Sequence, residues 1–134
     1  MFLNRLEKEE KIAFLELAHY VARSDNDFSD KEKNVINIYC TEMQISDVDF
    51  DKSSFNLGLT LSKIKSSQSQ KIILLEIMAL IYSDNFLHEE ERKVLEKILE
   101  EFNLNYHLAT VYGEWAKAIL SLYIQGNALV ELWG

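Results

Sequence analysis

The apolar residues of the chain follow helical spacing, and the clearest case is the segment 89–102. Its apolar positions recur at i, i+1, i+4, i+5 and i+8, which places them on one face of an amphipathic helix. These residues are Val94, Leu95, Ile98, Leu99 and Phe102. The preceding segment 72–82 is apolar on almost every side, so the helix that it predicts must be enclosed by other helices. We therefore expect a helical protein whose core helix covers about 70–82.

The pattern around 89–102 occurs a second time, fifty-nine positions earlier in the chain. At this shift, five residues of the first copy meet identical residues in the second: Ser24, Asp25, Asn26, Glu32 and Val35. The apolar positions that follow are in register as well. A match in both the bend and the helix face indicates a duplicated helix-loop-helix unit, with copies near 11–45 and 71–104. The sequence predicts an all-α fold, a single-domain bundle of about six helices with approximate two-fold symmetry, over residues 1–134.

Capping signals predict where two of the helices begin. Asn4 and Glu7 have the spacing of a capping box, which favours a first helix over about 5–23. Ser29 and Glu32 offer the same arrangement to the helix that follows the first bend. The absence of proline from the chain agrees with long helices joined by short turns.

The end of the chain is expected to hold a long helix and an apolar tail. A short helix is predicted over 55–64 and a long one over 106–124, which Gly126 and Asn127 are expected to end. The tail 126–134 is apolar for a chain end. We expect it to fold back over the core, because ordered chain ends are usually held locally. Burial against a second copy, which would give a homodimer, is the alternative.

Each copy of the repeat has an apolar helix that ends in Asp, a short loop, and a helix that opens with Glu. In this the chain resembles the TerB-like domains of the tellurite-resistance family, over about residues 10–125. That family usually has Asp-Gly where this chain has Asp25-Asn26 and Asp84-Asn85, and Asn tolerates the left-handed backbone conformation that Gly adopts. The resemblance implies metal contact at the acidic positions and a role in stress resistance, without a settled reaction.

Four acidic residues flank the two bends: Asp25, Glu32, Asp84 and Glu91. If the two-fold symmetry brings the bends together, these carboxylates repel one another and favour a bound cation. Oxygen ligands suit a divalent ion such as Ca²⁺, Mg²⁺ or Mn²⁺. The alternative interpretation is structural, because glutamates stabilise helix N-termini and aspartates bond loop amides. Both interpretations stay open, and the structural one needs fewer assumptions.

Composition and charge limit the partners of the chain. The 134 residues, 48% of them hydrophobic, are enough for one globular domain. A formal net charge of −8 argues against nucleic acid and anionic membranes as partners, because both repel an acidic surface. The longest apolar run, 72–82, is too short to span a bilayer, which takes about 20 residues. We expect no membrane insertion and a cytoplasmic location, with the single cysteine, Cys40, as a buried inert thiol.

Several side chains have a functional and a structural interpretation. The aromatic residues near the end are expected to pack in the core rather than to line a partner's groove: Tyr112, Trp115, Tyr123 and Trp133. Glu76, within the core helix, is expected to reach solvent on one face. His19, His88 and His107 share no metal-ligand spacing, and the chain has no phosphate loop, nucleophile elbow or zinc pattern. We infer that the protein is not an enzyme.

Two functions are consistent with this sequence. The first is a non-enzymatic TerB-like module that binds a divalent cation at the paired acidic bends and serves in a stress-response assembly. The alternative is a metal-free adaptor that meets an unknown protein partner through its acidic surface or its apolar C-terminal tail.

Overall fold

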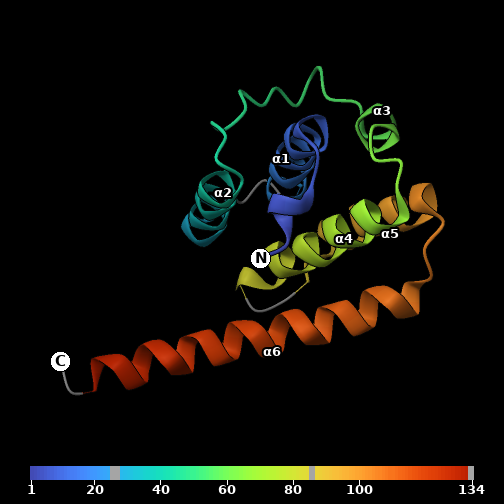
Figure 1. Ribbon diagram of the computed structural model, residues 1–134. Coiled ribbons are helices and arrows are strands. Elements are labelled where there is room, and N and C mark those ends of the chain that lie inside the picture. The colour runs from blue at the N-terminus through green and yellow to red at the C-terminus, as the bar shows by residue number, and fades with distance from the viewer. Residues whose placement is uncertain (25–27, 85–86, 133–134) are drawn as a thin grey trace.

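The computed structural model describes residues 1–24, 28–84 and 87–132, and this part of the chain is helical with no strand. Figure 1 shows the helices in chain order. The elements are η1 (Leu3–Arg5), α1 (Lys8–Ala22), α2 (Asp30–Met43), α3 (Leu57–Ser62), α4 (Ser67–Ile81), η2 (Tyr82–Asp84), α5 (Glu89–Phe102) and α6 (Tyr106–Glu131). The prediction of an all-α bundle of about six helices is confirmed.

The duplication is visible in where the helices begin and end. Moving α1 and α2 forward by fifty-nine residues gives the bounds of α4 and α5 at all four ends. The C-caps correspond as well, because Gln44 after α2 and Asn103 after α5 both have left-handed backbone (φ 57° and 53°). A left-handed residue directly after a helix turns the chain so that the following backbone amides hydrogen-bond to the last carbonyls of the helix. The two helical hairpins are therefore structural copies of each other.

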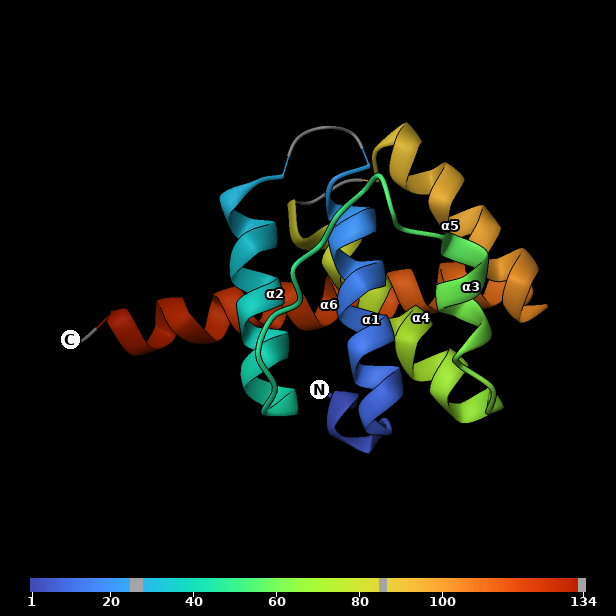
Figure 2. The same ribbon diagram turned by 90° about the horizontal axis from the view of Figure 1, so that it is seen from above.

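The two copies meet around an approximate two-fold axis. α1 packs against α4, its own equivalent, and Ser69 Oγ donates a hydrogen bond of 3.1 Å to Glu10 Oε1. These residues also occupy equivalent positions in the two copies and are both buried. η2 contacts α2, and α1 contacts α5, so the helix ends that flank the two bends lie at the same end of the bundle (Figure 2).

The core is centred on α4, as the sequence predicts. Five of its side chains have no solvent exposure: Ile73, Leu74, Ile77, Leu80 and Ile81. α1 covers one side of α4 and α6 crosses another. The crossing is close at Gly113, where a Cβ would lie 3.0 Å from both Met78 Cε and Tyr82 Cε2. Glycine at this position lets α6 approach the core helix.

The N-terminal segment differs from the prediction. The first helix begins at Lys8, and its capping box joins Glu7 and Glu10 rather than Asn4 and Glu7. The preceding residues form the 3-10 turn η1, because Leu3 is fully buried and the chain must bend to place it there. Burial of this apolar residue outweighs the capping preference of Asn4.

Glu76 is buried, with 4% exposure, so the expectation that it reaches solvent is wrong. The N-terminal segment covers it. The amino group of Met1 lies 2.8 Å from Glu76 Oε2, and the amide of Phe2 donates to the same oxygen at 3.3 Å. The amino group also lies 2.6 Å from Glu42 Oε1. A buried carboxylate needs such partners, and here the start of the chain supplies them.

α6 does not end at Gly126 and Asn127 but continues to Glu131. Glycine ends a helix when it adopts a positive φ, and no described glycine does so. Within a helix, glycine costs only about 1 kcal/mol relative to alanine, and Ala128 and Leu129 beyond it are good helix formers. Residues 126–131 therefore extend the helix, and for the described part of the tail the expectation that it folds back over the core is wrong.

Candidate functional site

Glu32 and Glu91 cap the helices that follow the two bends. They are 2% and 0% exposed, in the first turns of α2 and α5. Glu32 Oε1 accepts from the Ser29 amide at 3.0 Å, while Ser29 Oγ accepts from the Glu32 amide at 3.1 Å. In the second copy, Glu91 Oε1 accepts from the His88 amide at 3.2 Å. Both carboxylates therefore fill the structural role that the alternative interpretation gives them.

The other two predicted ligands are described only in part. Asp25 lies outside the described residues, and of Asp84 only the backbone, at the end of η2, is described. In the part of the chain that the structure covers, no group of three or more His, Cys, Asp or Glu side chains is arranged to hold a metal ion. Cation binding at Asp25, Glu32, Asp84 and Glu91 therefore stays a prediction.

A buried histidine fixes the long linker between α2 and α3. His19, on α1, is 5% exposed, and its Nε2 lies 2.8 Å from Asp47 Oδ1 in the linker. Phe50 stacks on the imidazole with ring centroids 5.7 Å apart. No sequence pattern predicts this contact, because the partners are twenty-eight residues apart and follow no motif. It holds the linker over α1.

Cys40, on α2, is half-buried rather than buried as expected. Burial, followed by the negative charge of Asp47, raises the pKa of its thiol. A raised pKa leaves little reactive thiolate at neutral pH. The inert thiol predicted from the sequence is consistent with this environment.

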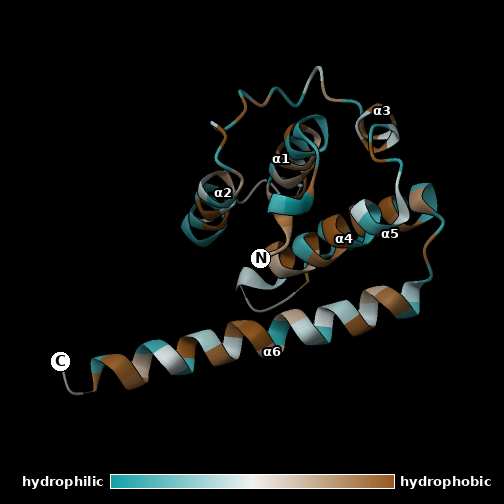
Figure 3. Cartoon of the chain, viewed as in Figure 1, coloured by the Kyte–Doolittle hydropathy of each residue, from teal (hydrophilic) through white to brown (hydrophobic). Residues whose placement is uncertain are grey.

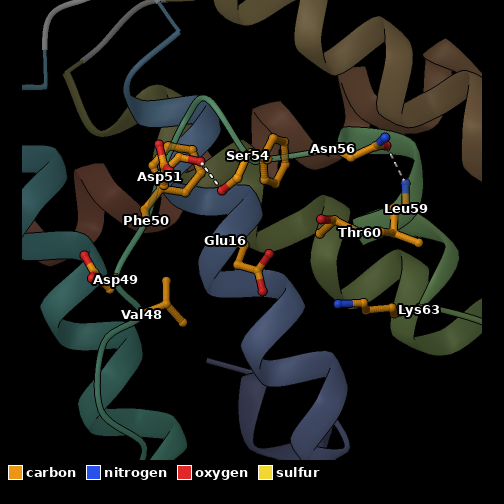
Figure 4. A pocket seen from close by; sticks show the side chains of 11 residues that line it. Glu16, Val48, Asp49, Phe50, Asp51, Ser54, Asn56, Leu59, Thr60 and Lys63 are labelled. Carbon is orange, nitrogen blue, oxygen red and sulfur yellow. Dashed lines mark hydrogen bonds between the residues drawn. The ribbon is translucent and has the colours of Figure 1, made fainter.

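The linker also arches over a surface pocket of about 270 Å³ between α1 and α3 (Figure 4). Glu16 of α1 and Lys63 at the end of α3 extend over it. The Asp51 carboxylate accepts from the amide and the hydroxyl of Ser53, at 3.0 and 2.7 Å, which lowers its pKa. The pocket is slightly smaller than the roughly 300–1,000 Å³ typical of ligand sites. Asp51 shapes the linker turn, and the acidic side chains that line the pocket are not buried.

The most exposed apolar surface is on the C-terminal half of α6. In both views this half extends past α2 and away from the other helices (Figures 1 and 2), and it carries several apolar bands (Figure 3). Six large side chains here are 61–78% exposed: Leu122, Tyr123, Ile124, Leu129, Val130 and Leu132. The expectation that Tyr123 packs in the core is wrong. Trp115 is 36% exposed and packs beside Phe2, so the same expectation is wrong for it. Tyr112 is half-buried against the core, while Trp133 lies outside the described residues.

Two of these residues, Leu122 and Leu129, belong to an apolar stripe along one side of α6. Apolar or small residues recur at alternating steps of four and three: Trp115, Ile119, Leu122, Gly126 and Leu129. This is the spacing of the contact positions in paired helices. The flanking positions of the exposed part, 118, 123, 125, 130 and 132, carry no charge. We call Trp115, Ile119, Leu122, Gly126 and Leu129 the α6 seam. Monomeric proteins rarely expose an apolar surface of this size without a binding role.

The fold and this surface define an all-helical bundle whose last helix packs on α4 with its N-terminal half and exposes apolar side chains on its C-terminal half. None of the described helices meets the length and hydropathy that a bilayer span requires. Comparison of the chain with known proteins gave no matching family model, no matching curated protein and no matching solved structure. The TerB-like resemblance therefore rests on the repeated bends alone and stays a prediction.

Proposed function

We propose that this chain is a non-enzymatic interaction module that binds an apolar helix of a protein partner along the α6 seam. This is the adaptor function that the sequence leaves as the alternative, with the tail as its contact surface. The observation that carries it is the exposure of Leu122 and Leu129 in the seam, and of Tyr123 and Val130 beside it. All four lie on the half of α6 that extends away from the bundle (Figure 1). The rest of the molecule positions this helix through the close crossing at Gly113.

The free energy gained by burying this surface is of the same order as the cost of association. Burying one large aliphatic side chain stabilises a complex by about 1.5–3 kcal/mol. Four such side chains therefore offset a substantial part of the roughly 4–15 kcal/mol that association costs in lost freedom and ordering. A partner that buries these side chains gains this free energy, which is not gained while they stay in water.

A helix is the partner that fits the seam best. The alternating steps of four and three suit the knobs-into-holes packing of two helices, in which a narrow stripe meets another narrow stripe. A membrane surface is a poorer fit. Interfacial helices carry Lys and Arg on their polar face, whereas residues 118–132 contain neither and the whole chain has a net charge of −8.

Site-specific photo-crosslinking tests this proposal. A photoreactive residue at Leu129 is expected to join the full-length protein to a defined protein partner, identified by mass spectrometry and then shown to bind in purified form by calorimetry. The same residue at Asn127, on another side of the helix, is the matched control. Leu122→Glu should remove both the crosslink and the calorimetric signal. Crosslinking that is equal at both positions, or absent at both, would contradict the proposal.

The TerB-like function has its own test. If the acidic bends bind a divalent cation, protein purified without chelator should contain stoichiometric metal, and Asp84→Asn and Glu91→Gln should abolish binding in a calorimetric titration with Ca²⁺, Mg²⁺ or Mn²⁺. In that case the partner at the α6 seam would belong to a stress-response assembly. A melting temperature indifferent to EDTA, with no heat of binding, would leave the adaptor function alone.

A further inference from the structure

We propose that the partner at the α6 seam is a second copy of this chain, with the two α6 helices antiparallel and crossing at Gly126. This inference rests on the proposed function, because it names the occupant of the same surface. Three features support it: the glycine itself, the symmetry of the residues around it, and the distribution of charge.

Gly126 lies in the interior of α6, where glycine destabilises a helix relative to alanine. At Gly113 the cost is offset, since the missing side chain lets α6 approach α4. At Gly126, apart from the adjacent residues and the nearby backbone of α6 itself, no described atom lies within 4 Å of where a Cβ would be. Nothing within the described molecule uses the absent side chain. A helix from outside would use it, because a glycine in the seam lets two backbones approach closely.

The residues around Gly126 are symmetric in character. Tyr123 and Leu129 lie three residues away on either side, and Leu122 and Val130 lie four residues away. All four are apolar and 61–78% exposed. In an antiparallel pair with its two-fold axis at Gly126, Leu122 faces Val130 of the partner subunit. Tyr123 likewise faces Leu129 of the partner subunit. The surface is thus self-complementary, as a two-fold interface requires.

Charge favours the antiparallel arrangement. The paired segment 120–132 contains one charged side chain, Glu131. Pairing about Gly126 places it opposite Ser121 of the partner subunit, so no like charges meet along the paired segment. Each chain as a whole carries −8, and the helical bundles would repel if they lay side by side. Antiparallel pairing places them at opposite ends of the paired helices. The exposed segment 121–132 is about 18 Å long at 1.5 Å per residue, and pairing about Gly126 places residue 132 opposite residue 120 of the partner subunit, where its bundle begins.

The interface is small, so the test must cover a wide range of protein concentration. The four facing side chains supply on the order of 500 Å² of surface per copy, below the roughly 800 Å² per partner of a standard interface. We therefore expect a dimer that dissociates on dilution. Sedimentation or light scattering of the full chain, from low micromolar to near-millimolar concentration, should show the mass rising from one chain to two.

Matched substitutions separate the seam from the rest of the helix. Leu122→Glu should weaken dimerisation more than about a hundredfold, because it places an unpaired charge in the interface. Gly126→Leu should do the same by blocking the close approach, yet leave the melting temperature of the monomer unchanged or higher, since the site is open. Asn127→Glu and Asn127→Leu place the same side chains on another side of the helix and should leave the mass unchanged.

A disulfide experiment tests the register. In a Cys40→Ala background, a mixture of Leu122→Cys and Val130→Cys chains should form a crosslinked heterodimer under mild oxidation. Each variant alone should not, because equal positions 122 would lie about 12 Å apart along the axis, beyond disulfide reach. Crosslinking of each variant with itself would overturn the antiparallel arrangement.

The outcomes distinguish this inference from the proposed function. A monomeric mass at every concentration, with Leu129 photo-crosslinked to a different protein, overturns self-association and leaves the interaction module standing. A monomeric mass without any protein crosslink overturns both. Sedimentation of the chain with lipid vesicles that Leu122→Glu abolishes would also overturn both, in favour of a membrane surface.

Discussion

A methyl group added at Gly113 tests how closely α6 packs on the core helix. Alanine stabilises a helix interior by about 1 kcal/mol relative to glycine. Its Cβ would lie 3.0 Å from Met78 Cε and from Tyr82 Cε2, closer than ordinary contact. Overpacking of a core costs about 1–3 kcal/mol. We therefore expect Gly113→Ala to lower the free energy of unfolding by up to about 2 kcal/mol, and the melting temperature by a few degrees.

Gly126→Ala is the matched control, because it makes the same change in the same helix at a site where nothing lies within 4 Å. It should raise the free energy of unfolding by about 0.5–1 kcal/mol. Both changes are best made in a Leu122→Glu background, where self-association does not contribute, and measured by urea denaturation. Equal stabilisation by the two alanines would refute the close crossing of α6 over α4.

Two further predictions concern the caps and the N-terminus. Glu91→Ala should lower the free energy of unfolding by about 1 kcal/mol through loss of the capping box. Glu91→Gln should cost less, because glutamine can still accept from the His88 amide. Urea denaturation measures both, and equal losses would contradict a capping role. Stability should also fall in alkaline solution. Burial lowers the pKa of the Met1 amino group, but hydrogen bonds and charges from Glu42 and Glu76 outweigh it, so the pKa is raised. This contribution is complete below about pH 8, the unfolded value, and is lost as the pH rises through the folded value. Unfolding curves between neutral and alkaline pH should show the loss, and a variant with Glu42→Gln and Glu76→Gln should show less of it.

Local patterns predicted the helices well because their causes are local. The box of Ser29 and Glu32 lies within one helical turn and the apolar periodicity of 89–102 within a single helix, and the structure contains both. The fifty-nine-residue repeat predicted that the hairpins are copies, and the bounds of α1, α2, α4 and α5 agree with it. Such signals need no knowledge of distant contacts.

The missed features depend on contacts between distant segments or on small energy differences. Glu76 is buried because the first residues of the chain fold onto it, seventy-five positions away in the sequence. Asp47 meets His19 only once the linker crosses α1. At Gly126 the penalty for glycine in a helix is small, so good helix formers beyond it decide that α6 continues. A local sequence pattern contains neither these distant contacts nor these small energy differences.

The hydrogen bond between Ser69 and Glu10 has a consequence for how the two halves can diverge. Positions that meet across an approximate two-fold axis face their own counterparts, so a chain assembled from identical halves would place Glu against Glu or Ser against Ser there. The first would oppose two carboxylates in a buried setting, and the second would leave a gap where the longer side chain now reaches. The present contact uses a hydroxyl donor from one half and a carboxylate acceptor from the other. The repeat is therefore imperfect at its own centre, and a designer who restored full symmetry would have to replace both residues together, with side chains that both donate and accept.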